Sequence, residues 1–172
     1  NETKILSDNR DIKKILHKIK QDYSKTKYFE TYYYTFEKKF KNAINLDFLD
    51  EFNIEIIKWF IEQIGIKTEL LKSSDFNIKN QRSMKIIKIC KKLKKNYYLC
   101  NYGANEYLRS DFEEYKKENI QIFLHNYETK KYTQNSKVFD GYVSILDMLF
   151  NEGPKTLSTI RFGRKKPTAF SN

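Results

Sequence analysis

The sequence has 172 residues, of which 40% are hydrophobic and 16% aromatic, and its formal net charge is +11. This length allows one domain with a proper core but is short for two ordinary domains. No apolar run has bilayer length and no secretory signal is evident, so we expect a soluble, cytoplasmic protein without a transmembrane segment. Cys90 and Cys100 are the only cysteines, and they fit no metal spacing. This favours two reduced, buried thiols over a disulfide.

The positive charge allows two interpretations. Attraction to anions would suit nucleic acid, a nucleotide or a membrane surface. The lysines are spread along the predicted helices, however, and lysine, asparagine and isoleucine are abundant together, a pattern that compositional bias alone can produce. We therefore favour ordinary solvated helix faces over a dedicated basic surface.

Apolar residues at three- and four-residue spacing predict amphipathic helices along most of the chain. Ser7 or Asp8 is expected to cap the first helix, and Gly65 is expected to end the third. The aromatic segment Tyr28–Phe36 keeps a helical period, so we predict a helix there rather than a strand, with its rings packed in the core rather than stacked on a ligand. The predicted helices cover residues 9–25, 27–42, 47–64, 81–94, 144–152 and 155–161, with a further short helix after Gly103.

Three short apolar segments predict strands, at Ile66–Leu71, Tyr97–Cys100 and Ile120–Leu124. Strands that alternate with helices indicate an α/β fold, here a small, mainly parallel sheet flanked by amphipathic helices. We expect a single domain over residues 1–160. Residues 161–172, which include Arg164, Lys165 and Lys166, are expected to form a basic, mobile tail.

Parallel sheets place ligands outside the carboxyl ends of their strands. In this chain the predicted ends carry three polar loops, which would converge if the strands are neighbours. The loops contain Ser73 and Ser74, Asn101–Gly103, and His125–Tyr127. This coincidence predicts a pocket at that edge of the sheet.

Single residues in and near these loops have both functional and structural interpretations. Backbone N–H groups near Gly103 could hold a phosphate, although a strand-to-helix turn alone explains the glycine. His125 could act as a base near neutral pH, but a solitary histidine is more often a structural or surface residue. Asp147 lies in an apolar helix segment, where a carboxylate needs a partner. It could bind a hydroxylated or cationic ligand, although a hydrogen bond to a loop backbone is slightly favoured.

Known phosphate, dinucleotide, zinc and nucleophile motifs are not found, so no metal is expected and the cofactor is unknown. An ordered set of residues nevertheless runs from about Ile12 to Pro154 and resembles the WbqC-like protein family of bacteria. The set comprises Tyr23, Tyr28-Phe29, Ile64-Gly65-Ile66, Ser73-Ser74, Ile89-Cys90-Lys91, Tyr98-Leu99, Gly103-Ala104, Tyr107-Leu108, Tyr132, Gln134, Phe139, Ser144-Ile145-Leu146-Asp147, Phe150-Asn151 and Gly153.

The resemblance implies a role in bacterial surface-polysaccharide biosynthesis of the O-antigen type, with acyl or aminoacyl transfer to an amino sugar as the expected chemistry. The expected partners are a nucleotide-linked or lipid-linked sugar and an acyl or aminoacyl donor. The resemblance also implies a further amino-terminal segment that this sequence lacks, so a catalytic residue located there cannot be assigned.

Asp147 and His125 are the candidate catalytic residues, of which His125 comes from its place after a strand and not from the family pattern. The resemblance implies that sugar binding involves Ser73, Ser74, Gly103, Tyr107, Tyr132, Gln134, Ser144 and Asn151. Two alternatives stay open. One is a non-catalytic basic module that binds nucleic acid such as transfer RNA, and the other is a fragment without its catalytic half.

Overall fold

The computed structural model describes residues 3–5, 9–80 and 82–171, and these form two compact units. We call residues 1–67 with 129–162 the helical unit, and residues 68–128 with 163–172 the sheet unit. Both units are therefore discontinuous in sequence. The single domain predicted over residues 1–160 stays a prediction.

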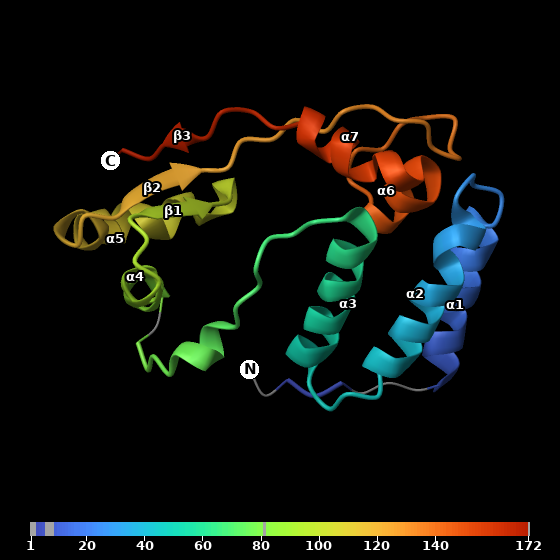
Figure 1. Cartoon of the computed structure of the whole chain (residues 1–172), viewed down its shortest axis with the longest axis horizontal. Helices are drawn as coiled ribbons and strands as arrows, with labels where there is room; N and C mark the ends of the chain where they lie inside the picture. The colour runs from blue at the N-terminus through green and yellow to red at the C-terminus, as the bar shows by residue number, and fades with distance from the viewer. Residues whose placement is uncertain (1–2, 6–8, 81, 172) are drawn as a thin grey trace. The chain divides into compact units, whose positions relative to one another are not determined.

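Amphipathic helices build the helical unit, and α1, α2 and α3 lie side by side in Figure 1. Their apolar faces enclose a core rich in aromatic rings, in which Phe29 stacks on Tyr33 with ring centroids 4.5 Å apart. The predicted helix through the tyrosine-rich segment is thus confirmed, and Gly65 ends α3 in the left-handed conformation as expected, with φ of 73°. The helices are α1 Asn9–Tyr23, α2 Phe29–Ala43, α3 Leu49–Ile64, α6 Ile145–Glu152 and α7 Thr156–Phe162, with a 3-10 turn at Gly153–Lys155.

The sheet unit contains a three-stranded sheet whose order is β1-β2-β3. Strands β1 (Tyr97–Cys100) and β2 (Gln121–Leu124) pair in parallel, with Tyr97 opposite Gln121 and Cys100 opposite Leu124. Helix α5 (Asn105–Lys117) makes the crossover, and α4 (Arg82–Lys92) packs with it against the same side of the sheet. Both cysteines lie in this core, buried and unpaired.

Two predicted elements differ in the structure. The segment Ile66–Leu71, predicted as a strand, pairs with no strand in the described residues; it is extended chain that leads from the helical unit into the sheet unit. Ile66 packs partly buried against the core of the helical unit, but Leu70 and Leu71 are each 49% exposed, so the segment has no continuous buried face of the kind a strand needs.

The second difference is at the carboxyl-terminal end, where a mobile tail is predicted over residues 161–172. Thr168–Ala169 instead forms β3, which pairs antiparallel with β2, and Phe170 is buried against the sheet. The sheet is therefore mixed rather than mainly parallel. The other two predicted strands are confirmed as β1 and β2. They bring the loops after Cys100 and Leu124 to one edge of the sheet, where the His125 N–H donates to the Cys100 carbonyl over 2.7 Å.

Candidate functional site

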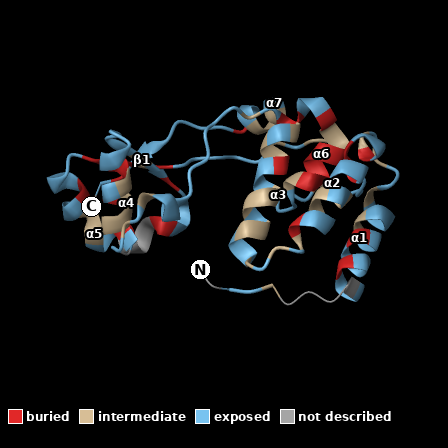
Figure 2. Cartoon of the chain, turned by 60° about the horizontal axis from the view of Figure 1, so that its bottom comes forward, coloured by how far each residue is buried: buried red, intermediate tan, exposed pale blue. Residues whose placement is uncertain are grey.

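The short helix α6 is the best buried element of the helical unit, and Figure 2 shows it largely in the colour of buried residues. Ser144 caps it, because its hydroxyl accepts a hydrogen bond from the Leu146 N–H over 3.2 Å. The apolar residues on both sides of Asp147 are buried in the core, and Asp147, in the first turn of the helix, is buried with them at 6% exposure. A buried carboxylate at this position needs hydrogen-bond donors.

The Asp147 carboxylate receives those donors from the loop that precedes its own helix. The Tyr132 hydroxyl donates to Asp147 Oδ1 over 2.7 Å, and Gln134 Nε2 donates to the same oxygen over 3.0 Å. The Tyr23 hydroxyl, from the last turn of α1, also hydrogen-bonds to this carboxylate. The partners are therefore side chains, whereas the sequence favoured a loop backbone. Asp147 joins α1, α6 and the loop into one polar cluster.

Gln134 extends this cluster across the loop. Its Nε2 donates to the Asp140 carbonyl over 2.9 Å, and its Oε1 accepts from the Asp140 N–H over 2.8 Å. The side-chain amide thus bonds to both the N–H and the carbonyl of Asp140 and closes the loop over residues 134–140. The Asn135 amide ties the same loop to the end of α1 by donating to the Asp22 carbonyl over 3.1 Å.

The cluster holds its tyrosines in the neutral state. Burial, followed by the charge of Asp147 and the hydrogen bond to it, raises the pKa of Tyr23 from 10.0 to about 12. Burial, followed by its hydrogen bond to Asp147, also raises the pKa of Tyr132, against a smaller opposing effect of Gln134. Both hydroxyls therefore stay protonated donors at neutral pH.

At the other end of α6, Gly153 allows a close approach that shapes a wall of the site. Its φ is +54° and its ψ is −123°, a combination that suits glycine. A Cβ at this position would lie 2.5 Å from the nearest ring carbon of Tyr28, so only glycine allows the Tyr28 ring to pack directly against the backbone of residue 153. The Tyr28 N–H donates to the Phe150 carbonyl over 2.9 Å, and the Asn151 amide donates to the Asp147 carbonyl over 2.8 Å.

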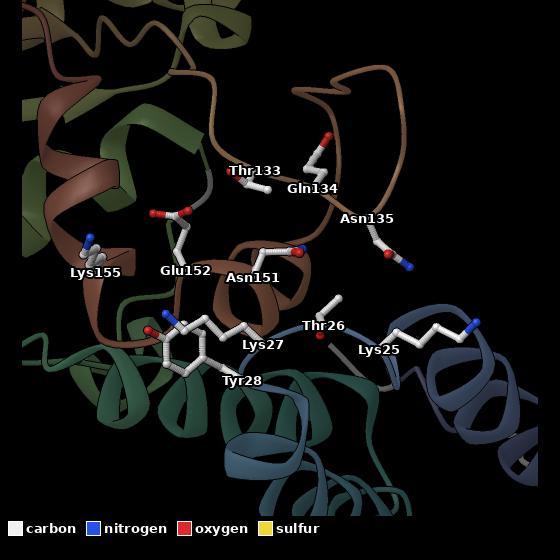
Figure 3. A pocket seen from close by; sticks show the side chains of 10 residues that line it. All are labelled: Lys25, Thr26, Lys27, Tyr28, Thr133, Gln134, Asn135, Asn151, Glu152 and Lys155. Atoms are coloured by element: carbon white, nitrogen blue, oxygen red, sulfur yellow. The ribbon is translucent and has the colours of Figure 1, made fainter.

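A cavity of about 380 Å³ lies between these elements, and Figure 3 shows the side chains around it. Three lysines line it, two from the loop after α1 and one from the end of the 3-10 turn, together with a single glutamate. The rest of its lining is polar or aromatic. The residues are Lys25, Thr26, Lys27, Tyr28, Thr133, Gln134, Asn135, Asn151, Glu152 and Lys155. We call this the basic cavity.

A second cavity of about 380 Å³ shares Gln134 and Asn135 with the first. Its charged lining is entirely acidic and consists of Asp22, Asp140 and Asp147; the remaining residues are Tyr23, Ser136 and Val143. We call this the acidic cavity. Two adjoining cavities with opposite charge can hold a ligand that carries an anionic group and, a few bonds away, a cationic or hydroxylated group.

The structure brings together five of the residues that the sequence predicts. Gln134 and Asn151 line the basic cavity, Gln134 and Asp147 line the acidic cavity, and Tyr132 and Ser144 hold this arrangement in place. The sequence analysis missed the charged residues of both cavities apart from Asp147. The available signal was the junction of the first two predicted helices, where Lys25 ends one helix and Lys27 begins the next beside Tyr28.

The remaining predicted residues belong to the sheet unit. Ser73 and Ser74 are exposed in a 3-10 turn (Ser73–Phe76) that follows extended chain and not a strand. Gly103 follows β1, but its φ is not positive, so its backbone does not require glycine. His125 is exposed after β2, and its ring stacks on Tyr127 at 6.1 Å. Tyr107 lies within α5, and its side chain lies outside the described residues. Roles for these residues remain predictions.

Fold and site together define a mixed α/β protein with a paired basic and acidic cavity beside a buried carboxylate. The chain belongs to the WbqC-like protein family, because the model of that family matches residues 1–159. This membership suggests a role associated with polysaccharide biosynthesis. Neither a curated protein nor a solved structure matches the chain.

Two further findings concern the described residues alone. None of their helices combines the length and the apolar character needed to cross a membrane. Their histidine, cysteine and acidic side chains form no cluster of three or more that could hold a metal ion.

Proposed function

We propose that this protein is a cytoplasmic transferase that acts on a nucleotide-linked or lipid-linked amino sugar in the biosynthesis of bacterial cell-surface polysaccharide. The expected reaction is acyl or aminoacyl transfer to the sugar amine. One observation carries the proposal: a basic and an acidic cavity adjoin each other and share Gln134 and Asn135. Membership of the WbqC-like family supports the connection to polysaccharide.

The basic cavity suits the phosphate groups that link an activated sugar to its carrier. Lys25, Lys27 and Lys155 supply three ammonium groups, against the single carboxylate of Glu152. Tyr28 presents a ring beside them, with Lys27 Nζ 5.2 Å from its centroid. Positive charge in a concave site raises the local concentration of an anionic ligand and favours its binding.

The acidic cavity suits the amino sugar. Asp22 and Asp140 can accept hydrogen bonds from a sugar amine or hydroxyl. In the proposed reaction the amine nitrogen attacks the carbonyl carbon of the acyl donor, the new amide bond forms, and the bond between that carbonyl and its leaving group breaks. The proton lost by the amine goes to the leaving group. Asp147 is held by hydrogen bonds from Tyr132 and Gln134 and fixes the wall of the acidic cavity. That fixed wall orients the amine.

Calorimetric titration with three ligands tests the proposal. Uridine diphosphate glucosamine should bind more tightly than uridine diphosphate glucose, which has a hydroxyl in place of the amine, and both should bind more tightly than uridine diphosphate. Lys25→Gln combined with Lys155→Gln should weaken all three ligands by about tenfold or more, equivalent to about 1.4 kcal/mol. Asp22→Asn should reduce the preference for the amine.

Lys13→Gln is the matched control, because Lys13 is an exposed lysine of α1 that lines neither cavity. It should leave all three affinities unchanged. Binding that survives the double lysine substitution, or that shows no preference among the three ligands, would contradict the assignment of these cavities to an activated amino sugar.

A further inference from the structure

The sheet unit exposes one whole face of its sheet. Alternate residues of the strands point to opposite faces, and Ile122 and Leu124 of β2 are buried against α4 and α5. The other face carries Tyr97 and Leu99 of β1, which are 58% and 53% exposed. The ring of Tyr97 lies 5.8 Å from that of Phe123, the residue that alternates with the buried pair on β2. We call this surface, with the rings described next, the open face.

Aromatic rings continue along the open face past the end of β2. His125 and Tyr127 follow Phe123 at intervals of two residues, the spacing that keeps side chains of an extended chain on one side. Their rings stack with centroids 6.1 Å apart and an angle of 17° between the planes. Tyr97, Phe123, His125 and Tyr127 thus form a row of flat side chains that are accessible from solvent.

The charge around this row is strongly positive. The sheet unit has 15 lysines and arginines against 8 aspartates and glutamates, a net charge of +7 out of the +11 of the chain. Arg164 pairs with Tyr127 across an isolated antiparallel bridge, and Lys166 follows at the same two-residue spacing. Both are exposed. Between them Lys165 bonds to Glu128 over 2.7 Å, which neutralises the acidic side chain closest to Tyr127 in sequence.

A cavity of about 480 Å³ borders the open face and includes Phe123 and Gln121 in its lining. This volume is within the usual range for small-ligand sites, about 300–1,000 Å³. Its lining combines aromatic rings with side-chain amides, which can hydrogen-bond to the edge of a nucleobase, and one lysine. The other residues are Asn96, Phe112, Lys116, Asn119, Ile120, Ile122, Ala169 and Phe170.

We propose that the open face binds single-stranded nucleic acid. Bases stack on the ring row, one base enters the bordering cavity, and phosphates contact Arg164 and Lys166. Stacking on aromatic side chains combined with a positively charged surface is how proteins hold single strands. The +7 charge of the sheet unit favours nucleic acid, a polyanion, over an apolar protein partner. Such a partner would contact the aromatic rings but would gain nothing from the positive charge. The inference is independent of the proposed transferase activity, because all its residues lie in the sheet unit and the two cavities lie in the helical unit.

Fluorescence anisotropy with a labelled 12-nucleotide single-stranded oligouridylate tests the inference on the full chain. Tyr97→Ala should weaken binding by about tenfold, because one stacked base contributes about 1–3 kcal/mol to affinity. Tyr34→Ala is the matched control: Tyr34 is also 58% exposed but lies on α2 in the helical unit. Arg164→Gln with Lys166→Gln should weaken binding and reduce the slope of log affinity against log salt by about 1.4, that is, about 0.7 for each of the two phosphates that no longer meets a cation.

Three results would overturn the inference. They are equal affinity for a double-stranded RNA of the same length, equal losses in the Tyr97→Ala and Tyr34→Ala variants, and full competition by uridine monophosphate at a concentration similar to that of the oligonucleotide. Capture of a protein partner by the open face without oligonucleotide binding would also contradict it. None of these results would affect the nucleotide-sugar titration, because the variants of the two experiments lie in different units.

Discussion

Replacing Asp147 by asparagine tests whether this carboxylate holds the site together. The substitution keeps the shape of the side chain but removes the charge that three donors share: Tyr132 at 2.7 Å, Gln134 at 3.0 Å and the Tyr23 hydroxyl. A hydrogen bond to a charged group contributes about 1.5–3 kcal/mol to stability and a neutral one about 0.5–1.5 kcal/mol, so each bond should weaken by about 1 kcal/mol. We expect Asp147→Asn to lower the free energy of unfolding by at least about 2 kcal/mol.

Urea denaturation followed by circular dichroism measures this loss. Asp147→Ala leaves buried donors without any acceptor and should cost more, at least about 3 kcal/mol. Asp140→Asn is the charge-matched control, because Asp140 is exposed and its loss should change stability by no more than about 0.5 kcal/mol.

Titration of the tyrosines supplies an independent measurement on the same variants. The unfolded chain loses tyrosine protons near pH 10, whereas folded Tyr23 retains its proton to about pH 12. The folded state therefore binds more protons in this window, and stability falls as pH rises from about 10 to about 12. In Asp147→Asn the pKa of Tyr23 should move back toward 10 without reaching it, since burial is the largest cause of the shift. A variant that is as stable as the wild type, with unchanged tyrosine absorbance titration, would refute the assigned role of Asp147.

Two further predictions concern Gly153 and Glu55. Gly153→Ala should cost about 3 kcal/mol in urea denaturation and weaken ligands of the basic cavity, because the new Cβ would meet the Tyr28 ring at 2.5 Å and φ is +54°. Gly103→Ala, whose Cβ would lie 3.7 Å from its nearest neighbour, is the control and should be nearly neutral. Hydrogen bonds from Lys39 and Lys58 lower the pKa of Glu55 from 4.5 to about 2, so its contribution to stability is present above pH 4.5 and is lost as pH falls toward 2. Thermal denaturation should show a weaker acid dependence in Glu55→Gln than in the wild type or in the control Glu62→Gln on the same helix; an equal dependence in all three would contradict this.

Local pattern was sufficient to predict the elements that bury one face. The helical spacing of Phe29, Tyr33 and Phe36 predicted α2 despite the aromatic density, and those three rings are buried in the core. Pattern failed where pairing depends on a distant partner. Ile66–Leu71 alternates like a strand but has no neighbour to pair with among the described residues, whereas Thr168–Ala169 is too short to predict and exists only because β2 offers it an edge.

The candidate site shows the same division between local and long-range information. A carboxylate in an apolar helix predicts that Asp147 has a partner, but not that Tyr132 and Gln134 supply it from 15 and 13 residues away. The charged lining could not be predicted either, because Lys25 and Lys155 become neighbours of one cavity only when the helical unit is folded. In the sequence alone they are two among many solvated lysines.

In the helical unit, the residues that stabilise the site differ from the residues that contact the ligand. Tyr132, Gln134 and Asp147, three of the residues on which the family resemblance rests, satisfy one another by hydrogen bonds. A group that is already saturated has little capacity left for a ligand, so these residues fix the walls rather than select what binds. Selection then falls to the charged groups that line the two cavities, which include Lys25 and Asp22. Substrate preference in this protein should therefore change when the cavity charges change, while stability depends on the Asp147 cluster.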